Sequence, residues 1–183
     1  ALQQQPSVAV TNADGGFDGP DDVWMPVNPV AYATIRDNYN KKMNFRMSTY
    51  LEATLMDGLS FKTELSADYN LNKFYYYEPD YKFGVITNET RSGRWTKTDT
   101  KYWSWRNILT YSKTFANVHN INVMVGQEMS QSHWETQVSN ATGYLSNSTK
   151  DPSAGDISKS SGTGSQSDNS IASFFGRGFY SYD

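Results

Sequence analysis

Histidine and cysteine, the side chains that most often carry acid–base or metal chemistry near neutral pH, are few or absent in this sequence. His119 and His133 are its two histidines, and it has no cysteine. On an extended strand, which rises about 3.3 Å per residue, the two histidines would lie about 45 Å apart, too far to share a metal ion or an active site. Serine, aspartate and glutamate are abundant, but none stands in a nucleophile elbow or another catalytic spacing. The residues therefore predict a protein that is not an enzyme, with no catalytic residues and no resident cofactor.

Four aspartates near the start of the chain are the one candidate for metal binding. Ca²⁺ prefers carboxylate oxygens as ligands, and Asp14, Asp18, Asp21 and Asp22 lie in one segment. Their spacing is not that of an EF-hand loop. Acid-rich turns are usually just solvated, so calcium in this loop is the weaker interpretation, and no metal site is predicted.

Composition excludes several classes of protein and leaves one discrepancy. The 183 residues carry 16 Lys and Arg against 19 Asp and Glu, and a net charge of -3 is unsuited to binding nucleic acid through its phosphates. Mean hydropathy is -0.68, and no apolar run approaches the ~20 residues of a membrane helix. Hydropathy alone thus predicts a water-soluble protein. The discrepancy is that 15% of the residues are aromatic.

Alternation of apolar and polar residues is the strongest pattern in the chain. Such a period of two places apolar and polar side chains on opposite faces of a strand. The alternating runs cover about 13–15 residues at their longest, whereas strands of soluble proteins typically have ~5–6. The pattern predicts an all-β fold of about five long antiparallel strands, at 43–55, 59–71, 103–115, 121–130 and 171–183.

Connections between the predicted strands have two very different lengths. The turns at 57–58 and 116–118 are tight, and the other connections are long and rich in Gly, Ser, Thr, Asn and Asp. The long ones are the segments at about 5–42, 78–100 and 137–170. Within the last, the Gly- and Ser-rich part from Ser158 to Ser170 predicts a mobile loop. Because long and short connections alternate, all long loops fall at one end of the sheet. Short periplasmic turns and long extracellular loops are typical of a transmembrane β-barrel of the outer membrane.

Two aromatic clusters suit the boundary between lipid and water, where Tyr and Trp rings are enriched. One cluster ends the second predicted strand and the other begins the third, so antiparallel pairing would put both at the same height. The alternative interpretation is an aromatic corner of a soluble core. The predicted aromatic girdle consists of Tyr75, Tyr76, Tyr77, Tyr102, Trp103 and Trp105.

Six short phrases along the chain have a familiar order. They are Ala1-Leu2 with Pro6 and Asn12-Ala13-Asp14-Gly15; Asn28-Pro29; Asp57-Gly58-Leu59-Ser60-Phe61-Lys62; Trp105-Arg106-Asn107-Ile108-Leu109-Thr110-Tyr111; His119-Asn120-Ile121-Asn122-Val123 with Gly126-Gln127-Glu128; and Ser173-Phe174-Phe175-Gly176-Arg177 with Tyr180-Ser181-Tyr182-Asp183. Together they resemble the barrel of SusC/RagA-type TonB-linked outer-membrane transporters, over nearly all of the chain. Gly178-Phe179 departs from the Asn or Leu that is commoner in the family before this tyrosine.

This resemblance implies a barrel of about 22 strands, of which the chain would contribute about five strands and three surface loops. It implies energy-coupled import of oligosaccharides or peptides across the outer membrane of a Gram-negative bacterium. A SusD-like surface lipoprotein would close the barrel from outside, and TonB would act from inside through the plug. The plug, the TonB box and the final strands have no counterpart in this chain. We therefore expect the rest of the polypeptide to complete the barrel, because open strand edges are too costly in lipid.

Candidate contact residues follow from the predicted faces and loops. Eight charged side chains fall on the polar, lumen-facing side of the strands: Arg46, Glu52, Lys62, Glu64, Asp68, Arg106, Glu128 and Arg177. Solvated lumen charges are the plainer interpretation of this set, and contact with plug or solute is the alternative. Four loop aromatics are candidates for stacking on sugar rings or for burial against a partner: Trp24, Tyr81, Trp95 and Trp134.

Two other functions fit parts of the pattern. A soluble all-β carbohydrate-binding or adhesin-like module would bury the apolar stripes in a sandwich, although no second set of strands remains in the sequence. An outer-membrane barrel enzyme would need a catalytic constellation that the sequence lacks. Loop and lumen chemistry leaves the substrate class, glycan or peptide, open.

Overall fold

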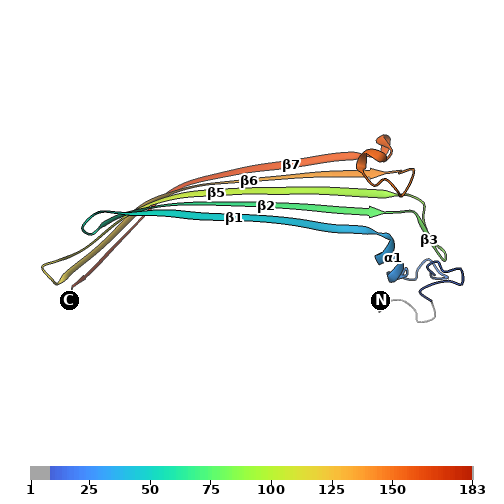
Figure 1. Cartoon of the computed structure of the whole chain (residues 1–183), viewed down its shortest axis with the longest axis horizontal. Helices are drawn as coiled ribbons and strands as arrows, with labels where there is room; N and C mark the ends of the chain where they lie inside the picture. The colour runs from blue at the N-terminus through green and yellow to red at the C-terminus, as the bar shows by residue number, and fades with distance from the viewer. Residues whose placement is uncertain (1–8, 183) are drawn as a thin grey trace. The chain divides into compact units, whose positions relative to one another are not determined.

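Five long strands form one antiparallel sheet in the computed structural model, which describes residues 9–182. The strand order is β1-β2-β5-β6-β7 (Figure 1). The predicted all-β fold with about five long antiparallel strands is confirmed. The phrase residues Ala1-Leu2, Pro6 and Asp183 lie outside the described residues. The five strands are β1 (Asp37–Met56), β2 (Leu59–Glu78), β5 (Ser92–Phe115), β6 (His119–Thr142) and β7 (Ser161–Tyr182).

Shorter elements occupy the connections at one end of the long strands. The helix α1 precedes β1, a two-stranded ribbon of β3 and β4 joins β2 to β5, and two single turns of 3₁₀ helix lie between β6 and β7. Their bounds are α1 (Pro29–Ile35), β3 (Tyr81–Phe83), β4 (Ile86–Asn88), and the 3₁₀ turns Pro152–Ala154 and Ile157–Lys159.

The strands run well beyond the alternating segments, with lengths from 20 to 24 residues. The predicted loops were therefore too long, because only 79–91 and 143–160 separate long strands on that side. The stretch predicted to be mobile lies largely in β7. At these strand ends the residues on both faces are polar, so the alternation of apolar and polar residues is lost although pairing with the neighbouring strand continues. Thr98 and Thr136, whose hydroxyl oxygens lie 3.0 Å apart between β5 and β6, are such a polar pair.

Both predicted tight turns are present and use left-handed backbone. Gly58 has a φ of 77°, and a Cβ at this position would lie 2.4 Å from the Ser112 carbonyl oxygen. In the other turn, Ala116 and Asn117 have φ values of 50° and 60°. Glycine at 58 thus serves both the turn and the close approach of β5.

The described chain packs as two compact units, and every long strand contributes residues to both. Unit 1 contains α1, the β3–β4 ribbon and the connection between β6 and β7, whereas unit 2 contains both tight turns. The bounds of unit 1 are Ala1–Lys41, Asn72–Lys97 and Gln137–Gly164, and those of unit 2 are Lys42–Leu71, Thr98–Thr136 and Ser165–Asp183.

Unit 2 has one apolar and one polar face. Large apolar side chains on the first face are exposed, including Phe45 at 58%, Leu51 at 75% and Phe174 at 81%. On the opposite face, the Arg46 guanidinium donates to the Asp68 carboxylate at 2.5 Å. A contiguous apolar face of this extent needs a cover, because monomeric soluble proteins rarely expose one.

Aromatic side chains make the core of unit 1. Tyr77 and Tyr144 cross edge-on with ring centroids 5.3 Å apart. Burial raises the pKa of the Tyr144 phenol above its ordinary value, so this residue stays neutral. The buried residues of the core are Tyr75, Tyr77, Ala141 and Tyr144, with Trp95 and Ala154 packed against them.

The predicted aromatic girdle does not lie at one height. Tyr75 of β2 contacts Trp95 of β5, whereas Trp105 of β5 donates its indole N–H to Thr63 of β2 at 2.9 Å. Positions 63 and 75 lie far apart along β2, so the two clusters belong to different levels of the sheet, and the prediction of equal height was wrong. The reason is that β5 begins at Ser92, well before the predicted start. A boundary role stays a prediction for Tyr75, Tyr76, Tyr77, Tyr102, Trp103 and Trp105.

A hydrogen-bonded clamp fastens the β6–β7 connection to the rest of unit 1. Two guanidinium nitrogens of Arg91 donate to the two Asp80 carboxylate oxygens, each at 2.8 Å, and a third donates to the Tyr144 carbonyl oxygen at 2.9 Å. Asn147 donates to Asp80 at 2.9 Å and accepts from the Tyr77 hydroxyl at 2.9 Å. Bidentate arginine–carboxylate pairs are among the strong hydrogen bonds in proteins. We call this group the Asp80 clamp.

Asn28 ties the segment before β1 together. Its side chain is fully buried and caps α1, accepting from the Val30 N–H at 3.1 Å and the Ala31 N–H at 3.3 Å. Its amide donates to the carbonyl oxygens of Val10 and Asp18 at 2.9 and 3.0 Å. One side chain thus starts the helix and anchors the preceding loop.

Replacing Asn28 by alanine should loosen this whole segment. The change removes the cap and two carbonyl partners, a loss of about 1–2 kcal/mol of local stability. Hydrogen-exchange mass spectrometry of the intact protein should show about tenfold faster exchange in 29–35. The exposed residue Asn40 offers a matched control, and Asn40→Ala should exchange like the parent protein. Equal exchange in both variants would contradict the anchoring role.

The Asp80 clamp should weaken in acid. The Asn147 amide and then the Arg91 guanidinium lower the pKa of Asp80 below its usual value. Because the folded pKa lies below the unfolded one, the stabilisation is present above about pH 4 and is lost as pH falls through the folded pKa. An acid-active protease should therefore cut the β6–β7 connection faster below that pH, relative to an unfolded substrate.

The variant Asp80→Asn is the control for this pH dependence. It lacks the titrating carboxylate, so its normalised cutting rate should be high and should not change over the same pH range. Parallel pH profiles in the variant and the parent protein would show that Asp80 is not the group responsible.

Candidate functional site

A row of three aromatic rings crosses β1, β2 and β5 in unit 1. Tyr39 of β1 stacks on Tyr75 of β2 with centroids 4.8 Å apart, and Trp95 of β5 meets Tyr75 edge-on at 5.1 Å. Because side chains along a strand alternate between its two faces, these three residues lie on the same face of the sheet as the apolar residues that follow in β1. We call them the aromatic row.

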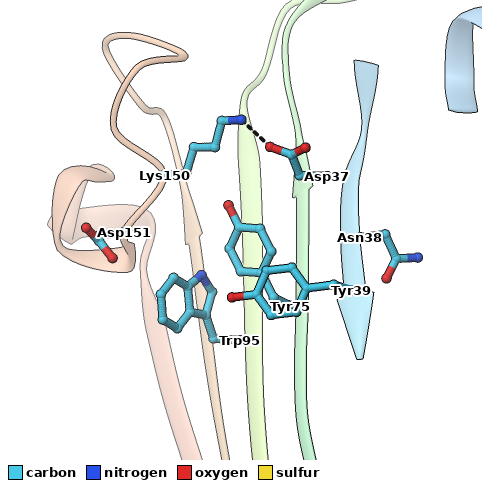
Figure 2. Close-up of a pocket in the computed structure, with 7 residues that line it drawn as sticks. All are labelled: Asp37, Asn38, Tyr39, Tyr75, Trp95, Lys150 and Asp151. Carbon is cyan, nitrogen blue, oxygen red and sulfur yellow. Dashed lines mark hydrogen bonds and ion pairs between the residues drawn. The ribbon is translucent and has the colours of Figure 1, made fainter. Parts of the chain in front are cut away.

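A cavity of about 460 Å³ lies beside the aromatic row. Asp37 and Asn38 line it from β1, and Lys150 and Asp151 line it from the β6–β7 connection. Lys150 and Asp37 form an ion pair, and Asn38 turns away from the rings (Figure 2). Ring faces together with a few convergent polar groups suit a sugar ring or a peptide side chain. We call this cavity the aromatic pocket.

A second cavity, of about 330 Å³, shares the aromatic row. It adds Lys73 of β2, Lys97 of β5 and Gln137 of β6 to the lining. Its walls are thus rings and lysine side chains, and it has no carboxylate among its lining residues.

A polar cluster lies on the opposite face of the strands from the aromatic row. Arg36 forms an ion pair with Glu78, and its guanidinium carbon lies 3.8 Å from the centroid of the Tyr32 ring. The Tyr76 hydroxyl donates to Glu78 at 2.9 Å, and the hydroxyls of Tyr32 and Tyr81 lie 3.0 Å apart. Burial and the bond with Tyr32 raise the pKa of Tyr81 well above its ordinary range, so it stays protonated. The cluster borders a cavity of about 360 Å³.

The predicted lumen-facing charges form two connected groups in unit 2. Arg106 of β5 donates to Glu128 of β6 at 3.0 Å and contacts Glu64 of β2 at 3.4 Å. Lys62 reaches the same Glu64 carboxylate at 2.5 Å, and Glu52 adds a charge that acts on Lys62. These side chains therefore neutralise one another across neighbouring strands. The second group is Arg46 with Asp68, while Arg177 is exposed on β7.

The four candidate aromatics have different surroundings. Trp24 is 91% exposed in the segment before α1. Tyr81 belongs to β3 and stacks on Phe83 with centroids 4.8 Å apart. Trp95 and Trp134 were predicted in loops, and this was wrong, since they lie within β5 and β6. Both strands extend beyond the segments in which apolar and polar residues alternate, so the sequence did not indicate that either tryptophan lies in a strand.

Metal-binding clusters are not found in the part of the chain that the structure describes. Among the acidic residues near the start, Asp18 and Asp22 accept hydrogen bonds from the backbone N–H groups of Gly19 and Trp24. The histidines have separate partners: His119 Nδ1 lies 2.8 Å from the Tyr180 hydroxyl, and His133 Nδ1 lies 2.8 Å from Asp168. Within residues 9–182, no helix is long and apolar enough to cross a membrane.

Sequence reasoning missed the residues that join distant segments. Lys150 and Asp37 pair although the whole of β2, β5 and β6 lies between them in the chain. Arg36 and Glu78 are likewise brought together by the β1–β2 pairing. The position of these charged residues at strand ends could have marked them as candidates, but it does not predict which residues pair.

Comparison with known proteins gives matches to one group. The chain is 28% identical over 124 residues to TonB-dependent receptor P39 of Formosa agariphila, covering 67% of this chain and 12% of that protein. It is 26% identical to TonB-dependent receptor P26 of the same organism, covering 100% of this chain and 19% of the relative. No protein-family model matches the sequence. The chain thus spans less than a fifth of the curated relatives that it matches.

Solved structures agree on the fold. The structure of the RagAB peptide transporter matches with a TM-score of 0.82 and 15% identity, over 93% of this chain and 20% of that chain. The RagAB peptide importer in its open-open state matches with a TM-score of 0.82 and 16% identity, over 93% of this chain and 19% of that one. The sequence matches and the shared five-stranded sheet lead to one conclusion: the chain is a segment of a TonB-dependent receptor of the Gram-negative outer membrane.

Proposed function

We propose that this chain forms wall and surface loops of a TonB-dependent transporter that imports oligosaccharides or peptides with a SusD-like lipoprotein. The observation that carries the proposal is the division of unit 2 into an exposed apolar face and an ion-paired polar face. Within a barrel, the first faces lipid and the second lines the lumen. The chain itself does no chemistry in this role.

The apolar face supports a membrane location on energetic grounds. Leaving a large apolar side chain in water forgoes about 1.5–3 kcal/mol. In β1 alone, Met43, Phe45, Leu51 and Leu55 are each at least half exposed. Several such side chains on each strand make an uncovered sheet costly in water, and lipid is a cover that satisfies every strand at once.

The soluble alternative fits this arrangement less well. A carbohydrate-binding or adhesin-like sandwich needs a second sheet packed on the apolar face. The described residues form the five-stranded sheet and the short β3–β4 ribbon, and the apolar side chains of unit 2 remain exposed. A barrel enzyme has no support from the sequence, which shows no catalytic spacing of serine, histidine or acidic residues.

Peptides are the first substrate class to test. The solved structures reported above are those of a peptide transporter, and the polar cluster, on the face opposite the lipid-facing one, offers a carboxylate, a guanidinium and phenol hydroxyls. Carboxylate, guanidinium and phenol groups bind peptide side chains and also sugars, so oligosaccharides are the second class. The loop aromatics Trp24 and Tyr81 are the candidate contacts that remain in connections.

A SusD-like lipoprotein would meet the long connections. Trp24 in the segment before α1 is 91% exposed, and Leu145 and Ile157 in the β6–β7 connection are 94% and 89% exposed. Tryptophan is among the residues enriched at protein interfaces, which makes Trp24 the first candidate of the three. TonB would act through the plug, which is another part of the receptor.

Single-cysteine labelling of the full receptor in cells tests the orientation. Leu145→Cys places a thiol in the β6–β7 connection, and Asp57→Cys places one in the β1–β2 turn, where the side chain is 92% exposed. A membrane-impermeant maleimide should label Leu145→Cys on intact cells. It should label Asp57→Cys only after the outer membrane is permeabilised. The reverse pattern would overturn the orientation, and equal labelling would argue for a soluble protein.

Uptake by cells that lack the receptor tests the transport proposal. Deletion of the complete gene should reduce uptake of labelled peptides or oligosaccharides to background, and re-expression should restore it only when the TonB system is energised. The receptor should also co-purify with a surface lipoprotein in mild detergent. Unchanged uptake of every peptide and glycan tried in the deletion strain would reject import by this receptor.

A further inference from the structure

Trp134 lies on the polar face of unit 2. The hydroxyl oxygens of Thr98 on β5 and Thr136 on β6 lie 3.0 Å apart. In the antiparallel register that joins this pair, Thr100 lies directly across from Trp134. Glu128, which belongs to the ion-paired charges of the polar face, precedes Trp134 by an even number of residues. Because side chains alternate along a strand, the indole shares the face of Glu128.

The indole ring of Trp134 is 38% exposed. Since β6 has a neighbouring strand on each side, this exposure does not come from an open edge of the sheet. The other tryptophans of unit 2, Trp103 and Trp105, lie on the apolar face. Their N–H groups donate to Gln131 and Thr63, respectively. Trp134 thus presents an aromatic ring on the polar side of unit 2, where a ligand could cover it.

Hydroxyl groups surround Trp134 on β6 and β7. His133 contacts Asp168 of β7 at 2.8 Å on the opposite face. This pairing places Ser167 across from Trp134. Ser132, two residues before Trp134 on β6, lies on the same face as the indole. Both neighbouring serines offer a hydroxyl group and carry no charge.

Hydroxyl and amide groups continue from Trp134 to β5 and β2. Arg106 of β5 contacts Glu64 of β2 at 3.4 Å. The same register places Asn70 of β2 across from Thr100, and Asn70 is exposed. We call this group of side chains the uncharged patch. Its members are Trp134, Asn70, Thr100, Ser132 and Ser167.

The charged side chains of unit 2 nearest to the uncharged patch are paired or lie at its far side. Arg46 donates to Asp68 at 2.5 Å, and Arg106 is held between two glutamates. Lys42 is exposed on β1, and both β2 and β5 lie between β1 and the strand that carries Trp134. An ionised group beside the indole would lose water without gaining a counter-charge, which is unfavourable. The patch therefore suits a neutral ligand rich in hydroxyl groups.

The uncharged patch lies at one end of the apolar run of unit 2. Ser48 of β1 and Ser66 of β2 have hydroxyl oxygens 3.1 Å apart. Their register places Asn44 across from Asn70. Met43, beside Asn44, begins the alternating run of β1. Under the proposed function, on which this inference rests, this end is the outer one, and a solute meets the patch before it meets the ion-paired charges farther along β5.

We infer that the uncharged patch binds a neutral sugar unit of an imported oligosaccharide, with Trp134 as its stacking platform. The apolar C–H face of the sugar ring covers the indole, and the neighbouring hydroxyl and amide groups exchange hydrogen bonds with the sugar hydroxyls. A peptide brings charged termini that find no counter-charge beside the indole. The patch therefore selects oligosaccharides from the two substrate classes that the proposed function leaves open.

Titration calorimetry of the complete receptor tests the site. Receptor purified in mild detergent is titrated with the neutral probes maltohexaose, xylohexaose, mannohexaose and galactohexaose, and with the acidic probe hexagalacturonate. A neutral probe should bind about tenfold more tightly than hexagalacturonate, whose carboxylates lack a counter-charge in the patch. Trp134→Ala should weaken binding of that neutral probe about tenfold, and Trp134→Phe, which keeps a smaller ring, about threefold.

Trp103→Ala is the matched control. Trp103 is 40% exposed, similar to Trp134, but lies on the opposite face of the adjacent strand. This variant should bind the neutral probe as tightly as the parent receptor. Thr100→Val keeps the shape of the side chain and removes the hydroxyl group across from Trp134, and should bind about threefold more weakly. Heat-dependent migration of the barrel in detergent gels checks that every variant is folded.

The outcomes separate this site from the transport proposal. Equal affinity of the parent receptor and Trp134→Ala for the neutral probe would overturn the site. Binding of hexagalacturonate in preference to every neutral probe, or no binding of any neutral probe, would overturn it as well, and import by the receptor would still stand. Unchanged uptake in the deletion strain, together with binding that depends on Trp134, would reject only the transport proposal.

Discussion

Hydrogen bonding of the backbone constrains this chain more than any other interaction. A strand that enters a bilayer must pair every N–H and C=O group within the protein, because lipid offers no partner. The five long strands pair in chain order, but β1 and β7 each have one edge without a partner among the described residues. The sheet is therefore stable in lipid only within a closed barrel. Closure explains why 183 residues, enough for a domain, here make only part of one.

The composition follows from the two environments, lipid and water, that the two faces of each strand meet. Alternation gives each strand an apolar face and a polar face, so mean hydropathy describes neither. On the polar face of unit 2, charged side chains form ion pairs with one another, as Arg106 does with Glu64 and Glu128. In unit 1 the polar residues of the connections are pinned by the Asp80 clamp and by Asn28. The many aromatic residues, which mean hydropathy did not explain, lie in the core of unit 1 and on the apolar face of unit 2.

The fold was largely predictable from the sequence, and the sites were not. Alternation over 43–55 and the dipeptide Asp57-Gly58 define a hairpin because side-chain period and turn chemistry are local properties. The polar strand ends, such as Ser161 to Ser170, were not predictable because pairing with β6 supplies their stability. Arg46 and Asp68 could be assigned to one face, since they share a hairpin. Arg106 and Glu64 could not be paired in advance, because a long connection leaves the register between β2 and β5 unspecified.

The ion pair of Lys150 with Asp37 has a consequence for assembly. Asp37 is the first residue of the edge strand β1, and Lys150 reaches it from the connection after β6. A slip of one residue in β1 would exchange its lipid and lumen faces, and it would also carry Asp37 away from its partner. The pair is therefore compatible only with the native register of β1, and it links that register to the connection after β6.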